Sequence, residues 1–273
     1  TFGCNFNQPI NIPNSVTHLT FGITFNQPIN IPNSVAHLTF GTMFNQPINI
    51  PNSVTHLTLG YIFNQPINIP DTKKIPKESF CNYTLILKES EGDSVTHLAF
   101  GYGFNQPINL SNNIVHLEFG GGFNRLVNIP NSVTYLRFGG EKSAKINIPD
   151  SVTYLKFNDN FNQLIDIPNS VTYLEFGKKF NQKIHIPSKV TYLKFGDEFN
   201  QHVNIPNSVT RLTFGICFGQ LLFLPKSLEQ LILPNPRYGH KIKLPCNLKV
   251  LVTSGPVSYS CTKLKNKIDI IRL

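Results

Sequence analysis

The stretch from Phe6 to Gly22, FNQPINIPNSVTHLTFG, returns along the chain with a step of 19 residues. Eleven further copies, some of them degenerate, begin at Phe25, Phe44, Phe63, Phe104, Phe123, Lys142, Phe161, Phe180, Phe199, Phe218 and Tyr238. The interval from Phe63 to Phe104 is 41 residues, which is one step of 19 plus an insertion of 22 at about 72–93. Self-similarity at a fixed period of this length is the signature of a repeat architecture.

Each copy predicts two short strands and two corners. Residues 18–21 alternate polar and apolar with period two, which is typical of a half-buried strand. Prolines on both sides of residues 10–12 leave no room for a helix, so this shorter alternation predicts a short strand or an extended segment. Residues 13–15 are turn-forming, and Gly22 permits a sharp bend.

A single coil of this kind cannot bury its apolar side, whereas stacked coils share a continuous core. Stacking places equivalent residues in columns, and six apolar columns are expected inside, those of Val16, Leu19, Phe21, Phe25, Ile29 and Ile31. The two Phe columns are predicted to be ring stacks, and the column of Asn7 is predicted to be buried at a bend where it satisfies backbone groups. We therefore predict an all-β solenoid of about twelve coils with one parallel sheet, formed by the whole chain, 1–273, as a single domain. Residues 72–93 are either a decayed coil or a protruding loop, and residues 252–273 are a C-terminal cap.

The repeated string resembles the FNIP repeat, which is found in amoeboid protists and in the large DNA viruses that infect them. Its second half, PNSVTHLTF, is similar to the P-x-S-L-x-x-L-x-V core of bacterial-type leucine-rich repeats. The resemblance implies a leucine-rich-repeat-like (LRR-like) solenoid, with Val16, Leu19 and Phe21 at the buried positions. Some members of the FNIP family carry an F-box before the repeats, which implies a role as a ubiquitin-ligase adaptor; no F-box is visible in this sequence.

Composition and charge exclude several classes of protein. Only 14% of the residues are charged, and none of residues 1–70 is Asp, Glu, Lys or Arg, although the chain carries a net charge of +9. A uniformly basic nucleic-acid binder would not leave a quarter of itself neutral. Five cysteines without a C-x-x-C pair favour a reducing, intracellular compartment. We therefore expect the protein in the cytoplasm or, if it is viral, in the host cytoplasm or the virion. No apolar run approaches the ~18 residues of a membrane span.

The outward columns of the predicted sheet hold the candidate binding residues. The central column reads His18, His37, His56, His97, His116, Tyr135, Tyr154, Tyr173, Tyr192, Arg211, Gln230. The column beside it contains Arg137, Lys156 and Lys194, interrupted by Glu118 and Glu175. Tyrosines and cations of this kind are enriched at binding hot spots, so the His, Tyr, Arg and Lys residues of both columns are the predicted partner-binding residues. The alternative for the histidines is that they have no binding role and are a tolerated surface residue that duplication of the coil has repeated.

No cofactor, metal or catalytic site is predicted. Adjacent histidines on neighbouring strands lie close enough to share an ion, but we expect no carboxylate or cysteine near them to complete its shell. No nucleotide-binding, zinc-protease or serine-hydrolase motif occurs. The sequence therefore predicts a non-enzymatic scaffold whose strand face binds an unknown protein partner. The alternatives are an architectural rod or virion or surface structural protein, and a nucleic-acid binder that stacks bases on the Tyr, Lys and Arg strip.

Overall fold

The computed structural model describes residues 1–69, 95–139, 146–261 and 268–272. The chain divides into two compact units, Thr1–Val133 and Thr134–Leu273, and each is described by itself. The predicted insertion at 72–93 lies outside the described residues, as does part of the predicted cap. The single domain over 1–273 stays a prediction.

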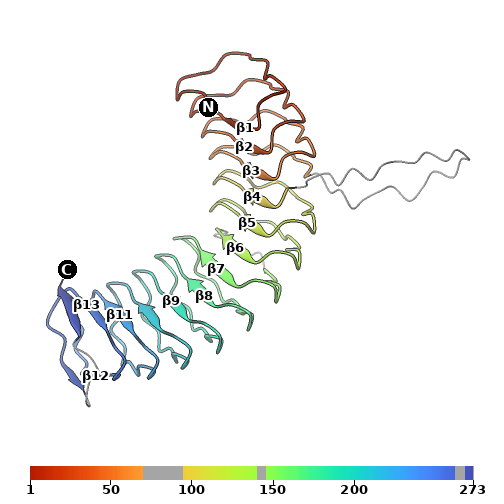
Figure 1. The fold of residues 1–273 in the computed structure, drawn as a ribbon. Helices are drawn as coiled ribbons and strands as arrows, with labels where there is room; N and C mark the ends of the chain where they lie inside the picture. Colours follow the sequence, from red (N-terminus) through yellow and green to blue (C-terminus); the bar gives the residue numbers. More distant parts are fainter. Residues whose placement is uncertain (70–94, 140–145, 262–267, 273) are drawn as a thin grey trace, which may run out of the picture. The chain divides into compact units, whose positions relative to one another are not determined.

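The first unit is a stack of coils that each contribute one short strand to a parallel sheet (Figure 1). Neighbouring strands pair in register, so that His18 lies opposite His37 and His56 lies opposite His97. The strands are β1 (His18–Thr20), β2 (His37–Thr39), β3 (His56–Thr58), β4 (His97–Ala99) and β5 (His116–Glu118). Because β3 pairs directly with β4, the sheet continues across the 22 inserted residues.

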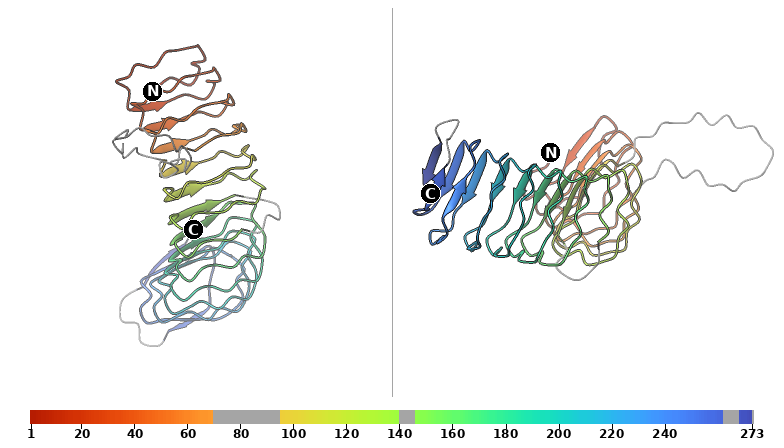
Figure 2. Two further views of the ribbon diagram at one scale, coloured as in Figure 1. Left: turned by 90° about the vertical axis from the view of Figure 1, so that its right-hand side faces the viewer. Right: turned by 90° about the horizontal axis from the view of Figure 1, so that it is seen from below.

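The second unit repeats this arrangement with eight parallel strands in one sheet (Figures 1 and 2). They are β6 (Tyr135–Phe138), β7 (Tyr154–Phe157), β8 (Tyr173–Glu175), β9 (Tyr192–Lys194), β10 (Arg211–Thr213), β11 (Gln230–Leu233), β13 (Val250–Thr253) and β15 (Asp269–Arg272). A separate two-stranded parallel sheet joins β12 (Ile242–Leu244) to β14 (Tyr259–Cys261). The predicted parallel-sheet solenoid with coils of about 19 residues is confirmed in both units.

The core consists of the predicted apolar columns. Val35, Leu38, Phe40 and Phe44 are each no more than 2% exposed, and their described equivalents are buried as well, except at the N-terminal end, where Phe2, Phe6 and Val16 are half buried. Phenylalanine rings stack both within a coil, as in Phe40 and Phe44 at 3.8 Å between centroids, and between coils. The columns of Ile29 and Ile31 differ from the others because several of their members, Ile29 and Leu110 among them, are only half buried.

The distance between coils increases from the sheet towards the opposite side. In the second unit the ring centroids of Tyr154 and Tyr173 are 4.0 Å apart, those of Phe157 and Phe176 are 5.3 Å apart, and those of Phe161 and Phe180 are 6.2 Å apart. The first unit shows the same gradient, with 4.2, 5.3 and 6.1 Å for the corresponding pairs. Each unit therefore curves so that its sheet lies on the concave side, called here the strand face; the opposite side is the back face.

This gradient is consistent with the lack of strand pairing in most back-face segments. Residues 10–12 and their equivalents were expected to form short strands or extended segments, and in the described residues they are extended segments without strand pairing except at β12 and β14. Backbone hydrogen bonds between strands need a separation of about 4.8 Å, whereas the Phe rings nearer the back face are 6.1–6.2 Å apart between coils. In the first coils, prolines at both ends of the segment also remove donors.

The asparagine column is structural, but its position was predicted wrongly. Asn7, Asn26 and Asn45 are exposed or half buried rather than buried. The Asn26 N–H donates to Asn7 Oδ1 at 2.9 Å, and Gln27 Nε2 donates to the same oxygen at 3.2 Å. This pattern recurs along both units, so each Asn side chain provides an acceptor to the next coil at a corner where no strand pairing exists.

Glycine follows most strands of the large sheet because the coils approach closely there, and not because of an unusual backbone conformation. The φ angles of Gly22, Gly41 and Gly60 lie outside the left-handed region, so the expected need for a sharp bend is not the reason for glycine here. A Cβ placed on Gly41 would overlap the carbonyl oxygen of Gly22 in the preceding coil. The glycine column thus allows the coils to stack at this corner.

We expect Asn181→Ala to destabilise the second unit. The substitution removes the acceptor of the Asn200 N–H and of Gln201 Nε2, and an unpaired backbone donor at a partly covered corner costs about 1 kcal/mol. Urea unfolding followed by circular dichroism measures the effect. Asn204→Ala, at an exposed back-face position, is the matched control and should change stability by less than about 0.5 kcal/mol. Equal unfolding midpoints for the two variants would contradict a structural role for the column.

Candidate binding surface on the strand faces

The five candidate histidines form one continuous stack on the strand face of the first unit. His18, His37, His56 and His97 follow one another at 4.1–4.2 Å between ring centroids, and His116 follows at 5.4 Å. Register pairing of the strands fixes this arrangement, because each histidine lies directly opposite the next. The structure therefore brings together all five histidines predicted from the sequence.

The environment of these histidines opposes protonation. Burial, followed by the charge of neighbouring imidazoles, lowers the pKa of His37, His56 and His97 below the ordinary 6.5. Few other charges act on the histidines, because Glu118 and Arg125 are the only ionised side chains among the described residues of this unit. Thr55 Oγ1 and Thr96 Oγ1 lie 2.9 Å from Nδ1 of the following histidine, which holds those rings in place.

The expectation that no carboxylate lies near the histidines is wrong at one position. Glu118 Oε1 is 2.9 Å from His116 Nε2, because the two residues alternate outward on the same strand, β5. This contact forms one His–carboxylate pair. Among the described residues, no group of three or more His, Cys, Asp or Glu side chains is placed to hold a metal ion.

The four candidate tyrosines form a second stack, on the strand face of the second unit. Ring centroids are 4.3 Å apart between Tyr135 and Tyr154, 4.0 Å between Tyr154 and Tyr173, and 4.2 Å between Tyr173 and Tyr192. The planes are nearly parallel, so both faces of Tyr154 and Tyr173 are covered by neighbouring rings. These two residues offer a partner their ring edges and hydroxyl groups rather than their faces.

Glu175 lies at the centre of a charged cluster beside the tyrosines. Its carboxylate accepts from Lys156 Nζ at 3.1 Å, from Lys194 Nζ at 3.0 Å and from the Tyr173 hydroxyl at 2.8 Å. The sequence placed Glu175 in an exposed column, but the residue is only 8% exposed because these three side chains, from β7, β8 and β9, close over it.

The pKa values of this cluster follow from burial and pairing. Burial alone would raise the pKa of Glu175, but hydrogen bonds from Lys194, Tyr173 and Lys156 outweigh it and hold the pKa below the ordinary range. Burial raises the pKa of Tyr173 strongly, and hydrogen bonds with Tyr154, Glu175 and Tyr192 add to this. The cluster is therefore an ionised carboxylate with two lysines and a neutral tyrosine at neutral pH.

The two candidate arginines lie at different places on the same face. Arg137 Nε donates to Asn158 Oδ1 at 2.9 Å, which holds the guanidinium against the glycine corner of the next coil. Arg211 follows Tyr192 in register on β10 and is exposed. Of the four candidate cations, Lys156 and Lys194 are thus compensated by Glu175, and Arg211 presents its charge to solvent.

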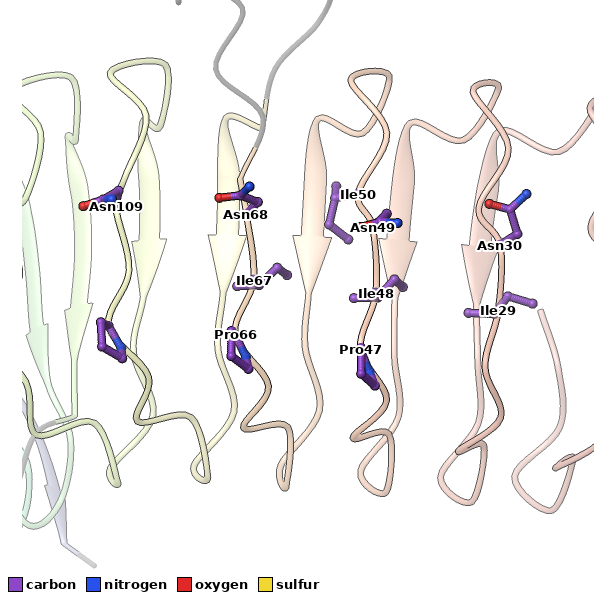
Figure 3. A pocket seen from close by; sticks show the side chains of 11 residues that line it. Ile29, Asn30, Pro47, Ile48, Asn49, Ile50, Pro66, Ile67, Asn68 and Asn109 are labelled. Atoms are coloured by element: carbon purple, nitrogen blue, oxygen red, sulfur yellow. The ribbon is translucent and has the colours of Figure 1, made fainter.

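The back face of the first unit carries a shallow groove that the sequence did not predict. It has a volume of about 680 Å³ and runs across successive extended segments, where Ile48 and Ile67 alternate with Asn49 and Asn68 (Figure 3). Prolines form one border of the groove (Figure 3). Its lining contains no ionisable group, so it offers only apolar contact and amide hydrogen bonds.

Within the described residues, no helix has the length and apolarity required to cross a membrane. The repeated coils, the in-register parallel sheet and the buried Val, Leu and Phe columns define an LRR-like solenoid. The sequence matches the FNIP Repeat family over residues 6–43, 44–75, 104–141, 142–179 and 180–217. The chain belongs to the FNIP repeat family, and the resemblance noted from the sequence is confirmed.

A solved structure supports the same fold. The chain is similar to CroV588, whose crystal structure is described as a novel circular LRR protein structure, with 34% sequence identity and a TM-score of 0.62. The similarity covers 89% of this chain and 40% of the CroV588 chain, so this chain spans less than half of that protein. No curated protein matches the sequence.

Acid is expected to destabilise the first unit. Because the pKa values of His37, His56 and His97 are lowered in the folded state, the unfolded chain binds protons more readily, and stability is lost as the pH falls below about 6.5. The melting temperature should therefore decrease between pH 7.5 and pH 5.5. Replacing all three residues by Tyr, which occupies this column in the second unit, should reduce that decrease. A melting temperature that stays constant over this range in the unaltered chain would contradict the prediction.

Glu175→Gln should destabilise the second unit by about 1–3 kcal/mol at pH 7. The amide cannot compensate the charges of Lys156 and Lys194, which both pair with the Glu175 carboxylate. Because the pKa of Glu175 is lowered on folding, its contribution is present at neutral pH and is lost as the pH falls below the ordinary carboxyl range. The difference between Glu175→Gln and the unaltered chain in urea unfolding should thus shrink at pH 3. Glu198→Gln, at an exposed corner, is the control.

Proposed function

We propose that the chain is a non-enzymatic scaffold that binds a protein partner through the strand face of its second unit. The observation that carries the proposal is the stack of Tyr135, Tyr154, Tyr173 and Tyr192, held at 4.0–4.3 Å by in-register strands. A concave sheet of a solenoid is the surface by which such folds bind extended partners. The tyrosines provide a binding strip that needs no rearrangement.

Preorganisation supports this proposal. A tyrosine side chain has few rotamers to lose on binding, and these rings are already fixed by their neighbours. The Glu175 cluster beside them fixes Lys156 and Lys194 as well, so charge, hydroxyl groups and ring edges all have defined positions before a partner arrives. Binding energy is then not spent on ordering the surface.

The nucleic-acid alternative receives less support from the same geometry. Stacking of bases requires free aromatic faces, and those of Tyr154 and Tyr173 are covered by neighbouring rings. Two of the four candidate cations are also compensated by Glu175. A protein partner, which can use hydroxyl groups and ring edges, fits the surface better.

The pathway is a finer part of the proposal. Because some FNIP repeat proteins carry an F-box, we propose that the strand face recognises a substrate for ubiquitin ligation, in the cytoplasm or, for a viral protein, in the host cytoplasm or virion. The three described cysteines whose side chains are placed are free thiols, which is compatible with a reducing compartment.

Tyr154→Ala combined with Tyr173→Ala should abolish capture of a specific partner in a pull-down from host-cell lysate followed by mass spectrometry. Truncation of central aromatic residues typically weakens binding by about thirtyfold or more, which corresponds to about 2 kcal/mol or more. The control is Asn204→Ala on the back face, which should leave capture unchanged. The same set of captured proteins for both variants and the unaltered chain would favour the architectural rod.

A further inference from the structure

A hollow on the back face of the second unit lies between two coils, outside the strand face. It has a volume of about 300 Å³ and separates residues 222–226 from residues 243–246, the latter including the end of β12. Leu222, Leu244 and Pro245 form its apolar lining. This volume is at the lower end of ligand pockets, so it admits one or two side chains rather than a large cofactor.

Phe223 at the wall of this hollow is exceptional in two ways. The residue at this position is Asn in the coils that contain Asn30, Asn49, Asn68 and Asn109, whereas here it is an aromatic residue that is 78% exposed. Its neighbour Leu221, at a position that is Pro in the first coils, is 46% exposed. Large apolar side chains that are exposed next to a hollow are typical of interaction sites.

The rim of the hollow is positively charged and lacks compensation. Lys226 and Lys243 line it, and Lys241 alternates outward with Lys243 along the segment that leads into β12. Among the described residues from 216 to 261 the only carboxylate is Glu229, and Lys249 pairs with it at 2.8 Å. By contrast, Lys156 and Lys194 on the strand face have Glu175 between them. The positive charge around the hollow therefore favours a negatively charged ligand.

We propose that this hollow, called the C-terminal back pocket, binds an acidic peptide segment that inserts one apolar side chain. The apolar lining and Phe223 receive the inserted side chain, while Lys226, Lys243 and Lys241 pair with carboxylates on either side of it. A lipid surface fits less well, because a bilayer lies against protruding side chains and does not fill a hollow between two coils. The pocket is a second binding site, on the face opposite the tyrosine stack.

Fluorescence anisotropy tests the proposal with a defined probe. The probe is a fluorescein-labelled ten-residue peptide of Asp, Glu and Ser with one central Phe, and it should bind the full chain at low salt. Phe223→Asn should weaken binding by about tenfold, and Lys226→Asn by about threefold; both changes install the residue that other coils have at that position, so folding should be retained. Leu164→Lys, which removes an apolar residue 75% exposed in another coil, is the matched control and should not change binding.

Two further measurements test whether the peptide occupies this pocket through both its charge and its aromatic side chain. Cys246 lines the pocket and Cys217 is exposed outside it, so the bound peptide should slow maleimide labelling of Cys246 severalfold while leaving Cys217 unchanged. A peptide whose carboxylates are replaced by amides, or whose Phe is replaced by Ser, should bind about tenfold more weakly.

The proposal is overturned by absence of probe binding below about 1 mM, by equal affinity of Phe223→Asn and the unaltered chain, or by equal affinity of the charged and amide peptides. Phe223-dependent sedimentation with phosphatidylserine vesicles, without peptide binding, would also overturn it in favour of a membrane. None of these outcomes tests the proposed role of the tyrosine stack, because Tyr154 and Tyr173 lie on the strand face.

Discussion

The register between coils is the constraint on which the rest of the structure depends. Parallel strand pairing places His37 opposite both His18 and His56, and Tyr173 opposite both Tyr154 and Tyr192. A shift by one residue within a strand would turn its buried Leu to the outside, so the buried columns help to fix the register together with the backbone pairing. Each exposed column is then also a stack of equivalent residues, whatever their chemistry. The His and Tyr stacks follow from the register alone, and no interaction between the rings is needed to explain them.

Curvature gives the two faces of the solenoid different chemistry. On the strand face the rings are within about 4 Å of each other and leave only edges and hydroxyl groups accessible, whereas the Phe rings nearer the back face are more than 6 Å apart. Behind the core the described segments stay unpaired except at β12 and β14, and hollows lie between the coils there, which are the groove of the first unit and the C-terminal back pocket. A partner on the strand face contacts an ordered strip of ring edges and hydroxyl groups, whereas a partner on the back face contacts hollows between coils.

Sequence periodicity predicted the coil length, the buried columns and the alignment of the candidate residues, because a strict repeat in a stacked fold determines which residues are neighbours. It did not predict burial of Glu175, which depends on three side chains from adjacent strands closing over one carboxylate. It also placed the Asn7 column inside, because periodicity gives the neighbours of a residue but not the exposure of a corner. The back pocket was missed since it depends on the separation of two segments, although the change from Asn to Phe223 and to Lys243 was a visible signal.

The positions at which the copies differ are therefore the most informative about function. The Val, Leu and Phe columns form the core, and most residues of the glycine column would overlap the preceding coil if they carried a Cβ, so these columns are alike in most coils and say little about binding. The exposed columns are free to change, and they change in blocks: His gives way to Tyr and then to Arg211 on the strand face, and Asn gives way to Phe223 and Lys243 behind it. A rod that only filled length would have no physical reason to gain an exposed Phe beside uncompensated lysines. The accumulation of such departures in the second unit, on both of its faces, is what favours a binding protein over a purely architectural one.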